Sequence, residues 1–241
     1  MPSFRIIGPG RAGGSLRIAL VEVGWRDRGV LGRVDDLSSA AEGVDLLVIA
    51  TPDAAVAEVA ATVSPSATTV VCHLAGSLGL DVLAPHPRRA ALHPLIAMPT
   101  AEVGAARLQA GAWFAVAGDP IVERVVADLG GRSFRVADEQ RGAYHAAAVI
   151  ASNHLVALLG QAERVARLAG VPLEAYLELV RVTVDNVAEL GPAAALTGPA
   201  ARGDWDTIRR HLEALPGDER ETYEVMVRAA RRLVEEREHD R

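Results

Sequence analysis

The first 136 residues alternate short apolar runs with segments of helical character, and this rhythm restricts the chain to few folds. Seven runs have the length of buried strands: Phe4 to Ile7, Gly29 to Leu31, Asp45 to Ala50, Thr69 to His73, Ala90 to Leu92, Trp113 to Val116 and Ser133 to Val136. Strands that are apolar on both faces and separated by helices predict a mostly parallel sheet covered on both sides. We therefore predict a doubly wound α/β domain over residues 1–136.

After Val136 the strand-like runs stop and only helical segments follow. The expected helices cover Glu139 to Ala169, Leu173 to Leu190, Trp205 to Leu215 and Asp218 to His239. The first two end in ordinary stop signals, since Gly170 with Pro172 and Gly191 with Pro192 follow them. We place a domain boundary at residues 136–138 and predict an all-α domain over residues 137–241.

Composition excludes several classes of function. All 25 Lys-plus-Arg residues are Arg, so neither a Schiff-base lysine nor a phosphate-loop lysine can operate. Few aromatic residues and a formal charge of -6 argue against nucleic acid, which basic and aromatic surfaces bind. The chain has a single cysteine, Cys72, and its opening residues contain no signal-like apolar run. It also lacks an uninterrupted apolar stretch of about 18 residues. These features predict a cytoplasmic protein without a membrane span.

A glycine-rich loop follows the first expected strand and precedes a helical pattern, in the form GxGxxG. In such a loop the first glycine permits a tight turn, the second lets the backbone approach a diphosphate, and the third lets the helix pack on the strand. Amides at the start of the helix would then meet the phosphates. The pattern favours a Rossmann-type dinucleotide site over a purely structural turn, with the cofactor held by Gly8, Pro9, Gly10, Arg11, Ala12 and Gly13.

The end of the second expected strand bears on which dinucleotide binds. An NAD site has an acid there, whereas an NADP site has a cation for the 2′-phosphate. Arg33 occupies this position, and Asp35 and Asp36 follow two residues later. Arg11 in the glycine loop could stack on the adenine or add a second contact. We therefore favour NADP, with NAD as the alternative; a simply solvated Arg33 is the non-functional interpretation.

Ligands of doubly wound sheets collect beyond the carboxyl ends of the strands. Thr51 and Pro52 follow one of these ends and are assigned to the cofactor, although with Asp53 they also have the pattern of a helix start. Ser77 and His93 follow two further ends and are assigned to the substrate. Ser77 could equally be a helix cap.

No metal site is expected. The histidines at positions 73, 86 and 93 are close in sequence, but they lack helical ligand spacing and a neighbouring carboxylate cluster. His73 is interpreted as a strand-end histidine with a structural role.

Several motifs together resemble the Rossmann-like proteins whose C-terminal half is a domain of unknown function numbered 2520. They are the glycine loop, Ala50-Thr51-Pro52-Asp53, Leu92-His93-Pro94-Leu95, Tyr144-His145-Ala146-Ala147-Ala148, Ala151-Ser152-Asn153, Leu196-Thr197-Gly198-Pro199 and Arg202-Gly203-Asp204. More distantly, the layout is similar to pyrroline-5-carboxylate reductase, ketopantoate reductase and the β-hydroxyacid dehydrogenases. The resemblance implies an NADP domain followed by a helical domain like the C-terminal domain of 6-phosphogluconate dehydrogenase, which often dimerises.

In ketopantoate reductase and the β-hydroxyacid dehydrogenases, a lysine on the first long helix of the second domain protonates the reduced carbonyl. This chain has no lysine, and the corresponding helix offers Arg141, His145, Ser152 and Asn153. At about 100° per residue the first three fall within roughly 40°, with Asn153 at the edge of the stripe. In the functional interpretation His145 donates the proton, Ser152 and Asn153 orient the substrate, and Arg141 holds a carboxylate. In the structural interpretation, solvent or a helix–helix interface satisfies the hydrogen-bonding groups of these side chains.

A turn rich in glycine and proline separates two later helices and adds two candidates. Thr197 and Arg202 lie in this turn and are assigned to substrate binding. Arg202 would bind a carboxylate of the substrate, across a dimer interface. Asp204 is better explained as the cap of the next helix.

Three functions remain open at this point. The first is an NADP-dependent oxidoreductase that reduces a small 2-oxo acid, with ketopantoate as the preferred class, or a cyclic imine. The second is an NADP-binding sensor without turnover, which the missing lysine favours. The third is oxidation of a hydroxy acid, as in prephenate dehydrogenase. We expect a small-molecule substrate and a homodimer.

Overall fold

The computed structural model describes residues 1–239, which divide into two compact units at the junction between Ser152 and Asn153. We expected the boundary near Val136. The junction lies further along the chain because the helix that follows the sheet keeps contact with it: Arg141 is buried and Tyr144 bonds to a sheet residue. The two units are described separately.

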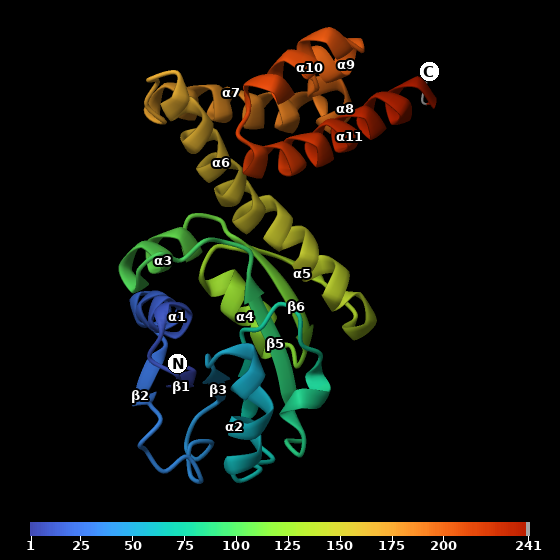
Figure 1. The fold of residues 1–241 in the computed structure, drawn as a ribbon. Coiled ribbons are helices and arrows are strands. Elements are labelled where there is room, and N and C mark those ends of the chain that lie inside the picture. Colours follow the sequence, from blue (N-terminus) through green and yellow to red (C-terminus); the bar gives the residue numbers. More distant parts are fainter. Residues whose placement is uncertain (240–241) are drawn as a thin grey trace. The chain divides into compact units, whose positions relative to one another are not determined.

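The first unit is built on one seven-stranded sheet (Figure 1). Its strands are β1 (Ser3–Ile7), β2 (Arg26–Leu31), β3 (Leu46–Ile49), β4 (Val70–His73), β5 (Arg89–Pro94), β6 (Trp113–Gly118) and β7 (Arg132–Arg135), in the order β2-β1-β3-β4-β5-β6-β7. Neighbours are parallel except β5 and β6, which are antiparallel. All seven predicted strands and the predicted fold class are confirmed. Strand order reverses between β1 and β3, which is where doubly wound sheets bind ligands.

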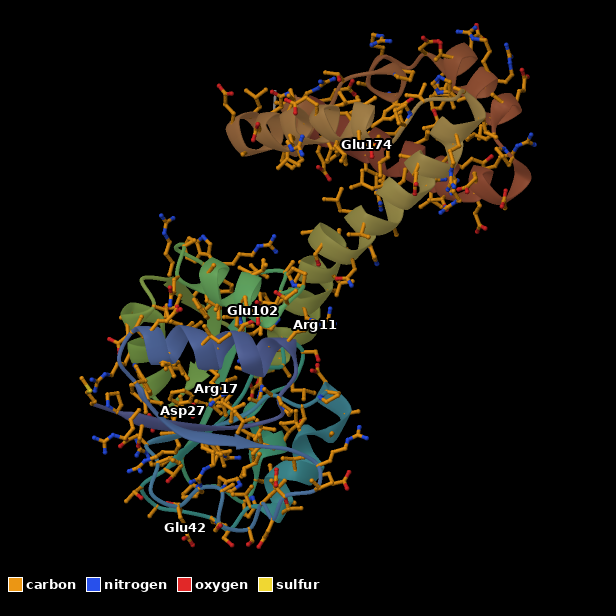
Figure 2. All side chains as sticks on the ribbon, turned by 90° about the vertical axis from the view of Figure 1, so that its left-hand side faces the viewer. Arg11, Arg17, Asp27, Glu42, Glu102 and Glu174 are labelled. Atoms are coloured by element: carbon orange, nitrogen blue, oxygen red, sulfur yellow. The ribbon has the colours of Figure 1, made fainter. Side chains whose placement is uncertain are left out.

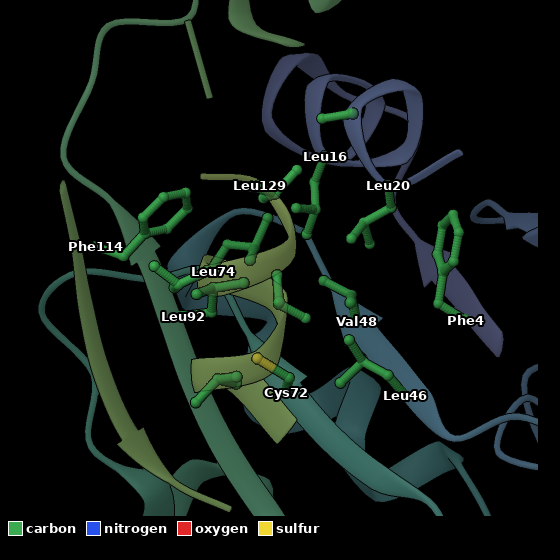
Figure 3. Close-up of a cluster of buried hydrophobic side chains, with 14 of the residues drawn as sticks. Phe4, Leu16, Leu20, Leu46, Val48, Cys72, Leu74, Leu92, Phe114 and Leu129 are labelled. Carbon is green, nitrogen blue, oxygen red and sulfur yellow. The ribbon is translucent and has the colours of Figure 1, made fainter. Parts of the chain in front are cut away.

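Helices cover both faces of this sheet, and each face has its own apolar core. Side chains alternate between faces along β3: Leu46 and Val48 pack with α1 (Arg11–Glu22), α3 (Ala101–Leu108) and α4 (Ile121–Asp128), whereas Leu47 and Ile49 pack with α2 (Val56–Thr62). Figure 3 shows the first of these clusters, with Leu16 and Leu20 of α1 above the strands. Two separate cores hold the sheet edges and the loops that follow them in place.

The predicted helix start after β3 is partly wrong. A single 3₁₀ turn, Asp53–Ala55, precedes α2, and Pro52 rather than Thr51 stands at its N-terminal cap. No side chain caps this turn, and the buried Thr51 hydroxyl has no hydrogen-bond partner. Thr51 is therefore not used by the fold as a cap.

A long helical segment runs from Asp138 to Leu168, as predicted, but it is not uniform. It comprises a 3₁₀ turn, α5 (Arg141–Val149), a π-helical turn (Ile150–His154) and α6 (Leu155–Leu168). Within residues 1–239, this segment is the one helix that is long enough and apolar enough to cross a membrane. None of its most apolar stretch of 18 residues is buried within the chain. This exposed apolar face was not expected from the sequence.

The second unit is all-helical, as predicted. Its remaining helices are α7 (Glu174–Leu190), α8 (Pro192–Ala195), α9 (Pro199–Arg202), α10 (Trp205–Ala214) and α11 (Gly217–His239), and the two short ones occupy the segment that we expected to be a turn. The buried Glu219 ties α6 to α11, since it pairs with Arg164 and its carbonyl accepts from Gln161 at 2.9 Å.

Candidate functional site

The glycine loop has the geometry that a dinucleotide needs. Gly8 has a φ of +107°, and a Cβ there would lie 2.7 Å from the Ala50 carbonyl oxygen at the end of β3. A Cβ on Gly13 would lie 2.3 Å from the Gly8 carbonyl oxygen, so this glycine allows α1 to pack on the loop. At Gly10 a Cβ would meet nothing within 4 Å. The first and third glycines are thus required by the fold, while the second faces open space.

The N-terminus of α1 is not capped by any side chain. Gly10 is its cap residue with extended backbone, and the first turn contains no acidic residue. Arg11 lies at this end of the helix, exposed, and takes part in no ion pair with the described residues (Figure 2). Free amides at a helix N-terminus attract anions, and the helix dipole adds to that attraction. The loop and helix fit a diphosphate.

In the turn after β2, the side chains of Asp35 and Asp36 are hydrogen-bonded, whereas that of Arg33 is not bonded to any of residues 1–239. Asp35 accepts a hydrogen bond from the Gly32 amide at 2.7 Å, and Asp36 accepts one from the Ser38 amide at 2.9 Å. The Ser38 amide favours the charged form of the Asp36 carboxylate and lowers its pKa. Within the described chain, no hydrogen bond or ion pair engages the exposed Arg33 side chain. Both acids are thus used by the turn, whereas the cation remains available.

A row of contacts links the glycine loop to residues at the ends of the next strands. Gly8 touches the backbone of Ala50 and Thr51 after β3. The next loop joins this one, because the Ser77 hydroxyl donates to the Asp53 carboxylate at 3.0 Å. Ser77 does not cap the following 3₁₀ turn, whose cap is Gly79.

Two histidines flank Gly76, the residue before Ser77. A Cβ on Gly76 would lie 2.6 Å from His145 Cδ2 and 2.9 Å from His93 Nε2, and the two imidazoles meet edge to face with their centroids 5.8 Å apart. No hydrogen bond within residues 1–239 engages the half-buried His145 ring. The row therefore runs from β1 to β5, across roughly 14 Å at about 4.8 Å per strand, and ends at a pair of imidazoles.

Tyr144 is a member of this site that sequence reasoning missed. Its hydroxyl lies 2.6 Å from His93 Nδ1, and its ring packs edge to face on Phe134 of β7. Burial raises the Tyr144 pKa to about 12, so the hydroxyl keeps its proton. The partners are 51 residues apart, and the sequence offered Tyr144 only as part of the family motif that contains His145.

Arg141 stands at the start of α5, the helix of Tyr144 and His145, and is fully buried. Its Nε donates to the Asp138 carboxylate at 3.2 Å, while both Nη atoms are buried without a partner. The other Asp138 oxygen accepts from the Leu80 amide at 2.9 Å. Arg141 is closed off from solvent in this structure, and its role in holding a substrate carboxylate stays a prediction.

The buried Arg141 charge acts on the neighbouring histidines. Burial is the main cause that lowers the pKa of His73 and of His93, each to about 4, and repulsion from Arg141 lowers both further. His73 is the structural strand-end histidine that we expected, since its Nε2 pairs with the Gly79 carbonyl at 3.2 Å. Both imidazoles are neutral at pH 7.

The predicted polar stripe along the long helix is not one surface. Arg141 is buried, His145 is half-buried and Ser152 is exposed, with its hydroxyl donating to the Ala148 carbonyl at 2.7 Å. Asn153 begins the second unit. Ser152 and Asn153 both lie in the π-helical turn, which a helical wheel of constant pitch does not represent.

The remaining candidates lie in the second unit. Thr197 and Arg202 are exposed, before and at the end of α9. The predicted cap is confirmed, because Asp204 accepts from the Thr207 amide at 3.0 Å at the start of α10. Within residues 1–239 no group of three or more His, Cys, Asp or Glu side chains is placed to hold a metal ion.

Residues 114–230 match the family described as Domain of unknown function (DUF2520). The resemblance identified from the sequence is confirmed over this region. No curated protein matches the chain in sequence.

Solved structures with the same fold include several reductases. A proposed NADP oxidoreductase from Bacteroides fragilis is 22% identical with a TM-score of 0.82, and the match covers 96% of this chain and 98% of that one. A reductive aminase from Aspergillus terreus in complex with NADPH and ethyl levulinate is 17% identical with a TM-score of 0.71, over 100% of both chains. A pyrroline carboxylate reductase from Plasmodium falciparum with NADP bound is 12% identical with a TM-score of 0.63, over 97% and 98%. At these identities the likeness establishes the fold.

Proposed function

We propose that this chain is a cytoplasmic NADP-dependent oxidoreductase that reduces a small 2-oxo acid of the ketopantoate type or a cyclic imine. The observation that carries the proposal is the row of contacts from the open glycine loop to the imidazoles of His93 and His145. NADP and NADPH complexes among the proteins of the same fold support the choice of cofactor.

The residues of the loop fit the cofactor. The open face of Gly10 and the uncapped amides of α1 would receive the diphosphate. The unengaged Arg33 would pair with the 2′-phosphate, with Arg11 as a second cation. The orphaned Thr51 hydroxyl, buried beside the loop, would gain the partner that it lacks.

The chemistry requires a hydride and a proton. A bound NADPH would supply the hydride that the carbonyl or imine carbon of the substrate accepts. His145 is the proposed proton donor, since its half-buried ring is free of hydrogen bonds to the described residues. It transfers one proton to the substrate oxygen or nitrogen as the double bond becomes single, and the resulting neutral imidazole regains a proton from solvent.

Turnover of NADPH with a panel of 2-oxo acids and cyclic imines tests the proposal. We expect one class to accelerate NADPH oxidation and the His145→Ala variant to lose about 10² to 10⁴ in kcat. His211→Ala, in the second unit, is the matched control and should remain active. Tight NADPH binding without any turnover in wild type, and no change on His145→Ala, would support a sensor instead.

We also propose a homodimer in which a second copy covers the apolar face of residues 138–168. Val156 and Leu168 on this segment are 69% and 63% exposed, and Leu179 of α7 is 62% exposed. Large apolar side chains exposed along one helical segment are typical of interfaces, and the ionic residues Glu163, Arg164 and Arg167 near the end of the helix are costly inside a lipid bilayer.

Sedimentation velocity tests the dimer. Wild type should sediment as a dimer, and Val156→Glu should shift it toward monomer. Val21→Glu, at a 48% exposed position on α1, is the control and should remain dimeric. A monomeric wild type, or one that floats with phospholipid vesicles through this helix, would contradict the proposal.

A further inference from the structure

We propose that Tyr144 is a positioning residue that holds His93 as a neutral imidazole with its proton on Nε2, so that His93 donates a hydrogen bond to the reacting oxygen or nitrogen of the substrate. This inference rests on the proposed reductase function. It gives His93 a role different from that of His145, because His93 stabilises charge at the substrate atom without transferring a proton.

The geometry of the pair fixes the ring. Tyr144 Oη lies 2.6 Å from His93 Nδ1, and the two rings are perpendicular with centroids 5.5 Å apart. Phe134 packs edge to face on the other side of the tyrosine, at 5.7 Å between centroids. A hydroxyl that donates to Nδ1 requires this nitrogen to be unprotonated, so a neutral His93 then carries its proton on Nε2.

The surroundings keep His93 neutral. Desolvation is the first cause that lowers its pKa to about 4, and positive charge on His145, on Arg141 and, when protonated, on His73 acts in the same direction. Asp53 is the one facing group whose charge raises the His93 pKa. A neutral imidazole is a good hydrogen-bond donor that does not compete with His145 for the proton-transfer role.

The Nε2 atom of His93 is on the side of the ring that faces the candidate site. It would lie 2.9 Å from a Cβ on Gly76, next to His145. It has no hydrogen-bond partner among residues 1–239, and it is not among the side-chain atoms that are buried without one. The donor is therefore accessible to a ligand at the carboxyl edge of β4 and β5.

A preorganised donor in this position would stabilise negative charge that develops on the substrate as hydride arrives. Its energetic value comes from its fixed orientation, since the donor need not reorient during the reaction. Tyr144 supplies that orientation through the hydrogen bond, and Phe134 limits the motion of Tyr144.

Nitrogen-15 NMR of the histidine side chains in the free protein tests the tautomer directly. At pH 7 we expect His93, identified by the signals lost in His93→Gln, to be neutral with Nε2 protonated. In Tyr144→Phe, which keeps the ring and its packing, the Nδ1 signal should change and the second tautomer should become populated. A proton on Nδ1 in wild type, a charged His93, or identical spectra in Tyr144→Phe would overturn the proposal.

The chain contains a matched control pair in its second unit. Tyr223 Oη lies 2.6 Å from His211 Nδ1, with ring centroids 5.8 Å apart and an interplanar angle of 86°. Tyr223→Phe should alter the His211 signals in the same way and leave NADPH turnover at the wild-type rate.

Steady-state kinetics provides the second readout. Tyr144→Phe should lower kcat by about tenfold and His93→Ala by about 10², with NADPH affinity unchanged in both; His93→Gln, which can still donate from its amide, should recover part of the loss. An unchanged kcat in His93→Ala would overturn the donor role. If wild type neither binds nor oxidises NADPH, the proposed function fails, while the NMR result still decides whether Tyr144 sets the His93 tautomer.

Discussion

Gly76 and His145 are in direct contact across the first unit, although they lie 69 positions apart in the sequence. The ring of His145 approaches the glycine so closely that a Cβ there would come within 2.6 Å of its Cδ2 atom. The glycine is buried on a strand-end loop and the histidine is on α5. This contact brings the proposed proton donor to the carboxyl edge of the sheet.

Adding a methyl group at this contact should disable the site selectively. In Gly76→Ala the new Cβ displaces the His145 and His93 rings, so we expect kcat/KM to fall by about 10² while NADPH affinity stays within a factor of about two. Gly142→Ala on the same helix has nothing within 4 Å of the new Cβ and is the control, expected to be fully active. A Gly76→Ala enzyme with wild-type kinetics would show that these rings do not need their present positions.

The three glycines of the first loop should respond differently to alanine. Gly10→Ala has space for its Cβ, so we expect normal stability but at least about tenfold weaker NADPH binding. Gly13→Ala would force a Cβ to 2.3 Å from the Gly8 carbonyl, and we expect the free energy of unfolding to fall by about 1 to 3 kcal/mol. Calorimetry and urea unfolding separate the two effects. Equal NADPH affinity in Gly10→Ala and wild type would argue against a diphosphate at this loop.

The fold could be predicted because its signals are local. Strands inside the sheet, such as Leu46–Ile49, are short runs that are apolar on both faces, and helix ends coincide with residues such as Gly170, with φ of +67°, and Gly191, with φ of +78°. The glycine loop could be predicted for the same reason, since one uninterrupted segment contains the strand end, the turn and the helix start.

The site near His93 could be predicted only in part. His93 and His145 were identified, but Tyr144 was not, because its partner on β5 is distant in sequence. The burial of Arg141 was missed because a helical wheel gives the relative angles of side chains without saying which side faces a sheet. Thr51 was predicted to cap a helix, but the 3₁₀ turn that follows it is not capped by the Thr51 hydroxyl.

Arg33 should set the preference between the two pyridine cofactors. A charge-assisted hydrogen bond to the 2′-phosphate contributes about 1.5 to 3 kcal/mol, so Arg33→Ser should weaken NADPH binding by about 10- to 100-fold and leave NADH nearly unchanged. Arg28→Ser, at an exposed position on β2, removes the same charge as a control. Equal losses for both cofactors, or an equal loss in the control, would remove Arg33 from the phosphate site.

Stability should fall between pH 6.5 and 4 because of His73 and His93. Their folded pKa values are lowered to about 4 from 6.5, so in this window the unfolded chain binds more protons than the folded one and acid favours unfolding. A pKa that differs by one between the folded and unfolded chain corresponds to about 1.4 kcal/mol, so we expect a loss of several kcal/mol, complete near pH 4.

Urea unfolding at a series of pH values measures this loss. The His93→Gln variant lacks one of the two groups, so its free energy of unfolding should change less steeply between pH 6.5 and 4 than that of wild type. Parallel curves for the variant and wild type, or stability that increases toward pH 4, would contradict the burial of a neutral His93.

A crystal structure of the chain with NADPH bound tests the central claim most directly. We expect the diphosphate on the amides around Gly10, the 2′-phosphate at Arg33, and the nicotinamide beside Gly76 within reach of a substrate held by His93 and His145. NADPH bound elsewhere, or bound at the loop with its nicotinamide directed away from Gly76, would contradict it.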